Sequence, residues 1–490
     1  MQYLPSIFAL DKSSPEPVYL QIAGILLQLT KNGTLQPGAR LPSTRKLAQQ
    51  LQVHRKTVIR AYDEMLAQGW LESHSGNGTF VANHVPESSP HHLLISKEKT
   101  MQASKVAGFQ LVDSPHLNRE EISYGYRLHL DDGLPDSRLA PLTELSRAYR
   151  SQLLTGNPYV KLGYGDAKGS PWLREELSDY LNESRGLRIT KDNILITRGS
   201  IMGIYLASTG LIKPGDHVVT GETSWRGADV NFIQAGAILN RIPVDQSGIQ
   251  VDELEKLCNK KKIRLVYVTS HHHYPTTVAL SAARRIRLLQ LSEKYGFIIF
   301  EDDYDYDFHY ENKPLLPLAS ADESGMVLYC GSFTKTISPA FRVGYLVGPE
   351  NVIHHLAQLR RVVDRQGDVV LENAIAELLR DGIVQRHRRK SLRLYRQRRD
   401  HFCNLLNNEL GKYAEFSIPD GGMAVWTKFD SGIDLVRLAR KALTKDLSFS
   451  NGLIHQHIPG ASLATRLGFA SSTEQELTES VGIISEILRS

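Results

Sequence analysis

The sequence has few cysteines and no long hydrophobic run. Its three cysteines, Cys258, Cys330 and Cys403, lie far apart without CxxC spacing, so neither a disulfide framework nor a zinc cluster is expected. No apolar stretch approaches the roughly 20 residues of a membrane-spanning helix, and the first residues lack the basic start and apolar stretch of a secretory signal. We therefore expect a cytoplasmic protein with no membrane segment and no metal site.

The chain also has little net charge. Its 58 Lys and Arg and 53 Asp and Glu leave a formal charge of +5, which by itself indicates no nucleic-acid partner. A length of 490 residues exceeds one ordinary core, since a domain averages roughly 150 residues. The patterning predicts a small domain at residues 15–84, a linker at 85–125 and a large domain at 126–490.

Three helical patterns and a hairpin pattern follow one another in the small domain. Apolar residues recur at helical spacing from Val18 to Leu29, Ser43 is placed to cap a second helix, and a third helix ends near Gly69. Two helices joined as closely as the second and third are typical of a helix-turn-helix. The segment WLESHSGNGTFVA then has two strand-like runs around turn residues, which indicates a wing.

Residues 40–60 are basic and contain no Asp or Glu. Their cationic side chains are Arg40, Arg45, Lys46, Arg55, Lys56 and Arg60. Such a surface suits DNA phosphates, and a recognition helix presents the side chains at its start to the major groove. A solvated basic face on a small bundle is the alternative, but charge, helix spacing and wing together favour DNA binding.

The segment LPSTRKLAQQLQVHRKTVIRAYDEMLAQGWLESHSGNGTFV closely resembles the winged helix of the GntR family. This resemblance implies that double-stranded operator DNA is the partner and that the wing enters the minor groove. The residues that we expect to contact DNA are Arg45, Arg55, Lys56, Thr57 and, at the wing tip, Gly76. His54 stands where many relatives have Ser, so the operator sequence stays open.

In the large domain, apolar runs alternate with amphipathic stretches. The runs NILIT, HVVTG, LVYVT, FIIFED and MVLYCGS are short and rich in β-forming residues, and helix-like sequence follows each of them. This alternation predicts an α/β fold with a mainly parallel sheet. Ligands of such folds bind at the carboxyl ends of the strands, so the residues directly after these runs are candidates for chemistry.

Residues after two of these runs suit an aldehyde cofactor with a phosphate group. Lys335 follows MVLYC on a Gly/Ser turn, where burial can favour the neutral amine that forms a Schiff base. Asp302 follows FIIF, where its carboxylate can hold a pyridinium nitrogen protonated. Ser332, Arg342 and the helix start in TRGSIMG are suited to bind phosphate.

The large domain resembles the fold-type I aminotransferases, and the whole chain resembles the MocR/GabR family of regulators. The motifs EDDYD and GSFTKTISPAFRVGY carry the resemblance most clearly. It implies an α+β winged helix followed by an α/β pyridoxal-phosphate transferase fold of type I with a mainly parallel sheet and a small C-terminal subdomain. It also implies pyridoxal 5′-phosphate as cofactor and a homodimer.

By the same resemblance, Lys335 holds the cofactor as an internal aldimine, Asp302 pairs with the pyridine nitrogen and Tyr304 approaches the ring hydroxyl. The phosphate contacts that it implies are Ser200 and Ile201, through their backbone, with Ser332 and Arg342. Tyr164 would reach the cofactor of a second subunit. Arg466 matches the arginine that binds an amino acid carboxylate in related domains, with a structural surface ion pair as the alternative.

Two segments depart from the family's patterns. Trp225 stands where relatives have a stacking aromatic in PGY, and we predict that it stacks on the cofactor ring. The run His271 to His273 replaces part of an SHQFP-like segment. A shared metal ion is the alternative, but consecutive side chains of an extended chain point in alternating directions. We interpret His272 and Tyr274 as lining the cofactor pocket.

A second basic stretch, QRHRRKSLRLYRQRRD, begins at Gln385. We predict a long helix in which Leu392 and Tyr395 pack inward and the arginines are solvated, partly stacked on neighbouring acidic surface. An auxiliary contact with DNA is the less favoured alternative.

Two functions are consistent with these modules. In the first, the protein is a DNA-binding transcription regulator, and a small amine or amino acid effector reacts with the cofactor and thereby changes DNA affinity. In the second, it is a working aminotransferase with an appended DNA-binding module. We favour the regulator, with at most residual transamination, because an enzyme gains nothing from a charged DNA-binding module. The sequence leaves the effector open, and likewise the choice between activation and repression.

Overall fold

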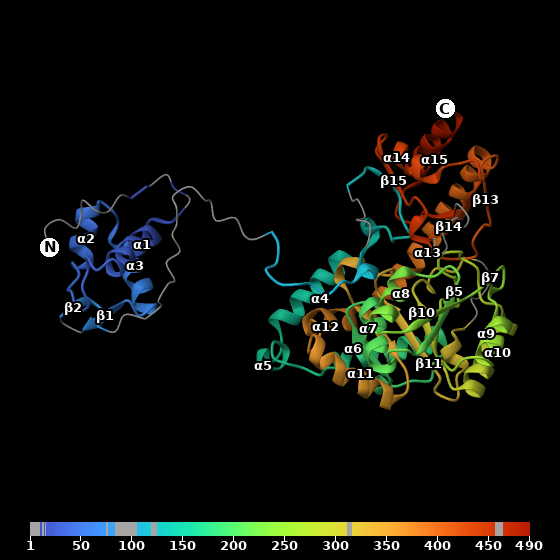
Figure 1. Ribbon diagram of the computed structural model, residues 1–490, viewed down its shortest axis with the longest axis horizontal. Helices are drawn as coiled ribbons and strands as arrows, with labels where there is room; N and C mark the ends of the chain where they lie inside the picture. Colours follow the sequence, from blue (N-terminus) through green and yellow to red (C-terminus); the bar gives the residue numbers. More distant parts are fainter. Residues whose placement is uncertain are drawn as a thin grey trace. The chain divides into compact units, whose positions relative to one another are not determined.

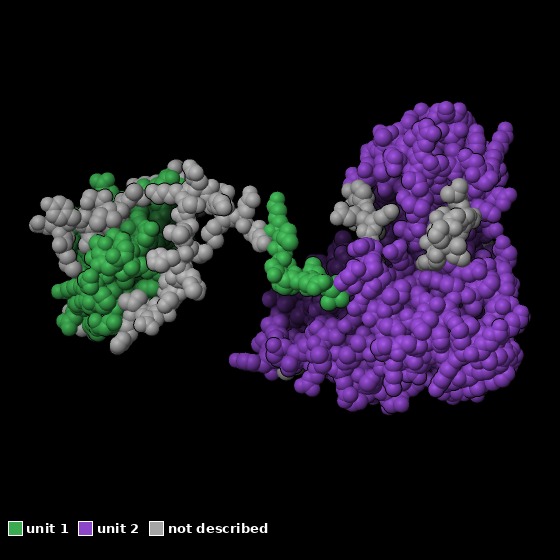
Figure 2. Space-filling view, in the orientation of Figure 1, with its two compact units in different colours: residues 1–112 green, residues 113–490 purple. Residues whose placement is uncertain are grey.

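The computed structural model describes residues 10–11, 14, 16–74, 77–83, 105–118, 125–310, 316–455 and 464–490. The chain divides into two compact units, residues 1–112 and residues 113–490 (Figures 1 and 2). Among the described residues, no helix is long and apolar enough to cross a membrane.

Three helices of the first unit surround one apolar core. They are α1 (Val18–Lys31), α2 (Thr44–Leu51) and α3 (Arg55–Ala67). Ser43 caps α2 by accepting a hydrogen bond from the amide of Lys46, and Gln52 ends the helix in a left-handed conformation. The chain therefore turns at once into α3, as the sequence predicted. Ile22, Leu47 and Val58 are fully buried in the core of this unit.

A hairpin completes the first unit. Strands β1 (Leu71–His74) and β2 (Gly78–Val81) pair antiparallel, with Leu71 opposite Val81. Both of these residues are buried in the core that the helices form. The arrangement of helices and hairpin confirms the predicted winged helix-turn-helix.

A seven-stranded sheet forms the centre of the second unit. In spatial order its strands are β4 (Ile194–Thr197), β12 (Gly344–Val347), β11 (Val327–Ser332), β10 (Ile298–Asp303), β9 (Ile263–Val268), β5 (His217–Gly221) and β6 (Ile238–Ile242). Within this sheet β12 runs antiparallel to both neighbours, and the other paired strands are parallel. All five predicted runs form strands of this sheet, and β6 and β12 are additional.

Helices cover the sheet because alternate residues of each strand face opposite sides. In β4, Ile194 and Ile196 pack with one buried cluster and Leu195 with another. The first cluster draws on α4 (Leu142–Leu154), α6 (Pro171–Arg185) and α12 (Val369–Arg380). The second draws on α7 (Ser200–Leu211), α8 (Arg226–Gln234) and α11 (Glu350–Val363). A third lies between the strands and α9 (Val251–Cys258) and α10 (Ala282–Tyr295), near the short hairpin of β7 (Val244–Asp245) and β8 (Gly248–Ile249). The short helix α5 (Pro158–Lys161) follows α4.

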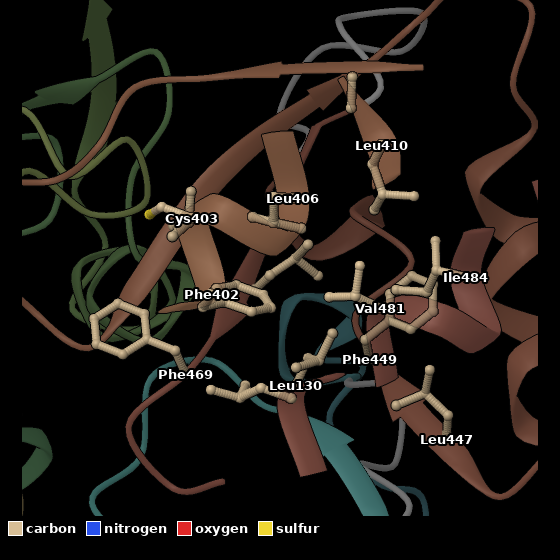
Figure 3. Packing of buried hydrophobic residues seen from close by; sticks show 14 of the residues in the cluster. Leu130, Phe402, Cys403, Leu406, Leu410, Leu447, Phe449, Phe469, Val481 and Ile484 are labelled. Carbon is tan, nitrogen blue, oxygen red and sulfur yellow. The ribbon is translucent and has the colours of Figure 1, made fainter. Parts of the chain in front are cut away.

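A smaller subdomain follows the sheet in sequence. Its antiparallel sheet has the order β13 (Ala414–Phe416), β14 (Ala424–Phe429) and β16 (Ala464–Gly468). Helices α13 (Ile383–Leu405), α14 (Leu435–Leu443) and α15 (Glu474–Arg489) supply much of its core, where Phe402, Phe469 and Val481 gather (Figure 3). Strand β15 (Leu447–Phe449) pairs with β3 (Leu128–Leu130), so the segment before the large sheet is tied to this subdomain.

The basic helix α13 differs in part from the prediction. Tyr395 is buried and Leu392 packs against the subdomain core, as expected. The prediction of solvated arginines is wrong for Arg398 and Arg399, which are both buried. Arg398 pairs with Asp136 at 2.9 Å, and Arg399 donates to the carbonyl of Pro419. Distant segments supply these acceptors, so the sequence pattern of the helix could not reveal the burial.

Candidate functional site

Asp302 and Lys335 both come from the carboxyl ends of neighbouring strands of the large sheet. Asp302 lies in β10, opposite Cys330 of the neighbouring strand β11, and Lys335 follows that strand. The Asp302 side chain is buried, and its Oδ2 accepts a 2.8 Å hydrogen bond from the Tyr267 hydroxyl. Its Oδ1 is buried and has no hydrogen-bond partner in the structure. A protonated ring nitrogen would supply the missing donor.

Burial shifts the pKa of both charged groups towards the neutral form, so Asp302 favours a cation that would keep it ionised. It raises the pKa of Asp302 to about 7, and the hydrogen bond from Tyr267 opposes this shift only in part. Burial also lowers the pKa of Lys335, because its ammonium loses solvation, although nearby Asp132 opposes the change. The Lys335 amine donates to the carbonyl of Gly133. A cation beside Asp302 and a neutral, nucleophilic Lys335 are thus both favoured.

The residues proposed for phosphate binding converge at one end of this edge. Helix α7 begins directly after Gly199, which has φ 75° and offers no capping side chain, so the first amides of Ser200 and Ile201 can face an anion. A Cβ on Gly344 would lie 2.7 Å from the Cα of Gly199, so the close approach of β12 requires glycine there.

Two side chains complete that end of the edge. Ser332, the last residue of β11, pairs with Gly344, and the Arg342 guanidinium donates to the carbonyl of Arg198 at 3.1 Å. These groups are suited to hold the phosphate of pyridoxal phosphate.

Arg466 comes from the smaller subdomain. It belongs to β16 and is 1% exposed, so it is not the surface ion pair that the sequence left as an alternative. Its guanidinium carbon lies 5.2 Å from the ring centre of Tyr274 and 5.6 Å from that of Tyr304. Its Nη1 also lies 3.3 Å from the Tyr304 hydroxyl. The Tyr304 hydroxyl itself donates to the carbonyl of His272 at 2.9 Å.

Asp132 belongs to the site and was missed in the sequence. Its Oδ1 lies 3.2 Å from Nε of Arg466, and its Oδ2 accepts a 2.6 Å hydrogen bond from the Tyr274 hydroxyl. Asp132 directly follows the short strand β3 and its neighbour Asp131, and no periodicity links it with Arg466 far along the chain. Tyr267 was also missed, although its position in the predicted strand LVYVT, next to the strand of Asp302, was a usable signal.

The three consecutive histidines have three different partners. His272 Nδ1 lies 2.7 Å from Asp305 Oδ1, with both side chains buried. His273 Nδ1 lies 2.9 Å from the Thr276 hydroxyl. The His271 ring packs edge-on against Tyr306 at 4.4 Å between centres. In the part of the chain that the structure describes, no three His, Cys, Asp or Glu side chains form a metal-binding group.

Two further aromatic candidates lie in different surroundings. Trp225 is half-buried and directly precedes α8. Tyr164 is 79% exposed, and the Arg365 guanidinium lies 3.8 Å from its ring centre. Within one chain, Tyr164 is therefore a surface residue.

The candidate DNA-binding residues lie at the starts of α2 and α3. Arg45, Arg55 and Lys56 are exposed, and Thr57 is half-buried. The Arg55 side chain donates a long hydrogen bond of 3.4 Å to the hydroxyl of Thr44, which joins the starts of the two helices. Gly76, predicted at the wing tip, lies outside the described residues.

Comparison with known proteins assigns both units. Residues 18–81 match the family of bacterial regulatory proteins called gntR, and residues 145–484 match aminotransferase class I and II. The chain is 30% identical to the uncharacterized HTH-type transcriptional regulator YisV of Bacillus subtilis, over 95% of each chain. It is 28% identical to the probable rhizopine catabolism regulatory protein MocR of Rhizobium meliloti, over 91% of this chain and 88% of that one. An archaeal alanine:glyoxylate aminotransferase superposes with a TM-score of 0.69 at 27% identity, over 74% of this chain and 90% of that one.

The protein is thus a DNA-binding transcription regulator that combines a winged helix with a domain of aminotransferase fold. It belongs to the MocR/GabR type of GntR-family regulators, which confirms the resemblance drawn from the motifs.

Proposed function

We propose that this regulator holds pyridoxal phosphate on Lys335 and changes its affinity for operator DNA when a small amine reacts there. The observation that carries the proposal is the unpartnered, buried Oδ1 of Asp302 on the strand beside the one that leads to the half-buried Lys335. An unpaired buried carboxylate is costly unless a cation faces it. The pyridinium nitrogen of the cofactor is such a cation, and the turn at Gly199 supplies amides for the phosphate.

When bound, pyridoxal phosphate would supply an electrophilic aldehyde carbon that Lys335 would hold and for which the primary amine of a ligand would compete. Tyr267 holds Asp302 in place through its 2.8 Å hydrogen bond. The Gly133 carbonyl accepts a hydrogen bond from the Lys335 amine and can hold it once released. No oxidation or reduction is required.

A contact between the first residues of the second unit and α8 offers a route by which the reaction of an amine at Lys335 acts on the linker. The turn η2 (Pro115–Leu117) packs against α8, the helix that Trp225 precedes. His116 Nε2 lies 2.7 Å from the Gln234 side-chain oxygen, and Arg226 donates to the Asn118 carbonyl at 3.2 Å. If Trp225 stacks on the cofactor, a change of ligand would act on α8 and on the chain that leads to the winged helix.

Exposed apolar side chains support a homodimer. Leu154, Tyr159, Leu162 and Tyr164 are 72%, 90%, 63% and 79% exposed on and beside α4 and α5. A soluble monomer rarely exposes such a group of large apolar side chains together. We propose that a second copy covers this surface and receives Tyr164 at its own cofactor site.

The test combines the visible spectrum of the purified protein with an operator-binding assay, while amines and amino acids are added without any keto acid. We expect one compound to replace the lysine-bound spectrum with a stable new one and to change operator affinity at the same concentrations. Complete conversion to the amine form of the cofactor, with unchanged DNA affinity, would instead identify a working aminotransferase. Absence of any cofactor absorbance would refute the proposal.

A further inference from the structure

The segment Asp131 to Gly133 is held firmly against the strand that bears Arg466. The Gly468 amide donates to the carbonyl of Asp131 at 2.7 Å. A Cβ on Gly468 would lie 2.3 Å from that carbonyl oxygen, so only glycine allows the contact. Gly133 has φ 75°, and a Cβ there would lie 3.3 Å from an Arg466 nitrogen. Two glycines thus bring this segment next to the Arg466 guanidinium.

Further hydrogen bonds fix the acidic residues of the segment. Asp131 accepts hydrogen bonds from the amide of Leu134 at 2.7 Å and from the Ser471 hydroxyl at 2.5 Å. Asp132 is held by the Tyr274 hydroxyl at 2.6 Å, while its other oxygen pairs with Arg466 at 3.2 Å. The contacts with Tyr274 and Arg466 therefore fix the Asp132 carboxylate against the buried arginine. The Asp132 side chain is 37% exposed.

We propose that Asp132 occupies, from within the chain, the place on Arg466 that a ligand carboxylate would take, so that the site selects primary amines that bring no carboxylate to this arginine. The inference rests on the proposed function, because it names the class of amine that reacts at Lys335. Asp132 acts here as a specificity-determining residue.

The physical reason is competition for one cation. Arg466 is 1% exposed, and besides Asp132 it contacts the Tyr274 and Tyr304 rings, the Tyr304 hydroxyl and the carbonyl of Pro275 at 3.4 Å, while Asp305 is a second carboxylate near enough to act on its charge. A ligand carboxylate must displace Asp132 or stand beside it, and the second arrangement sets two anions against one guanidinium. Displacement also breaks the hydrogen bond from Tyr274. A ligand without a carboxylate leaves the pair intact.

Three probes with one carbon skeleton test this preference. Pentylamine carries the amine alone, L-norleucine adds a carboxylate beside the amine, and 6-aminohexanoate adds one at the far end. Each is titrated into the cofactor-loaded protein, and its dissociation constant is taken from the change in the visible spectrum. Because a ligand carboxylate must compete with Asp132 for the Arg466 guanidinium, we expect pentylamine to bind on the order of tenfold to a hundredfold more tightly than either acid.

The variant Asp132→Asn keeps the shape and the acceptor for Tyr274 but removes the charge. It should strengthen binding of at least one of the two acids relative to pentylamine by a similar factor, a ratio in which any effect of the lost charge on Lys335 itself cancels because all three probes react at that lysine. Asp132→Glu keeps the charge and should keep the preference for pentylamine. The melting temperatures of both variants are measured as a control, and the Asp132→Glu preference remains a test if the Asn variant folds poorly.

The outcomes separate this inference from the proposed function. If all three probes change the spectrum but an acid binds the wild type best, or if Asp132→Asn does not alter the ratios, the inference is wrong and the proposed function stands. If the loaded protein shows cofactor absorbance that no probe changes, amine sensing and the inference both fail. If no cofactor absorbance appears at all, the proposal of pyridoxal phosphate on Lys335 fails with them.

Discussion

The two units of this protein assemble their candidate sites in opposite ways. In the winged helix, Arg45, Arg55 and Lys56 lie exposed at the starts of two consecutive helices, within a short stretch of sequence. In the large unit, Asp302 and Arg466 are buried, come from different sheets and lie far apart along the chain. A DNA-binding surface needs only exposed charges on locally ordered helices. A buried ligand site needs charged side chains that several distant segments of the chain bring together.

The largest expected effect separates the two sites. Lys335→Ala should abolish the visible absorbance of the Schiff base completely, because no other amine occupies that position, and should leave operator binding in the absence of ligand unchanged. The absorbance spectrum and a gel-shift titration measure the two properties. Lys294→Ala, a change at a surface lysine, serves as the control and should keep the spectrum. A Lys335→Ala protein that keeps the absorbance would place the cofactor on another residue.

Arg55→Ala should have the reverse effect. Loss of one arginine at the start of the recognition helix is expected to weaken operator binding by about 1–3 kcal/mol, roughly fivefold to 150-fold, and to reduce the salt dependence of binding. The cofactor spectrum should stay unchanged. Lys31→Ala, at the end of α1, is the matched control. Normal operator binding by Arg55→Ala at physiological salt would show that the start of α3 does not contact the operator.

Asp302→Asn tests whether a buried carboxyl group makes the stability of the large unit depend on pH, in contrast to the exposed charges of the winged helix. In the cofactor-free protein, the folded-state pKa of Asp302 is raised from 3.8 to about 7 by burial. As pH rises from about 4 to about 7, the unfolded chain releases this proton while the folded protein keeps it, so the wild type loses stability in that range. Asp302→Asn has no such proton and should become more stable than the wild type by up to about 2–4 kcal/mol near pH 8.

Thermal unfolding of both cofactor-free proteins across this pH range measures the effect. Asp63→Asn, at an exposed position of α3, should show no comparable change with pH. In the loaded protein the sign should reverse, because a pyridinium cation stabilises the Asp302 carboxylate, and Asp302→Asn should weaken cofactor binding. A difference between variant and wild type that stays constant from pH 4 to pH 8 would contradict the burial argument.

The smallest effect concerns the contact between η2 and α8. Arg226→Ala removes the hydrogen bond to the Asn118 carbonyl and should reduce, by a few-fold, the change in operator affinity that an amine produces. The donor is a charged guanidinium, but both groups are exposed to solvent, so the bond contributes only about 1 kcal/mol, which sets this scale. Cofactor absorbance and ligand-free DNA affinity should both be retained. A ligand response equal to that of the wild type would exclude this contact as the route between the units.

Local signals in the sequence predicted much of this protein. Ser43 and Gly69 mark the ends of helices because capping and turn chemistry act over a few residues. The five apolar runs predicted strands of one sheet, and because ligands of parallel sheets bind at the carboxyl ends of the strands, Asp302 and Lys335 were candidates for one site. Resemblance to known motifs then supplied their roles, which stay predictions for the individual residues.

Only the tertiary structure revealed Asp132 beside Arg466, Tyr267 beside Asp302, and the burial of Arg398 and Arg399. These relations join residues that no helical or strand period connects. The sequence determined that each local segment forms its own helix, strand or turn, because those choices depend on neighbours along the chain. The fold decided which charges are paired and which are buried, because solvation and Coulomb energies depend on distance in space.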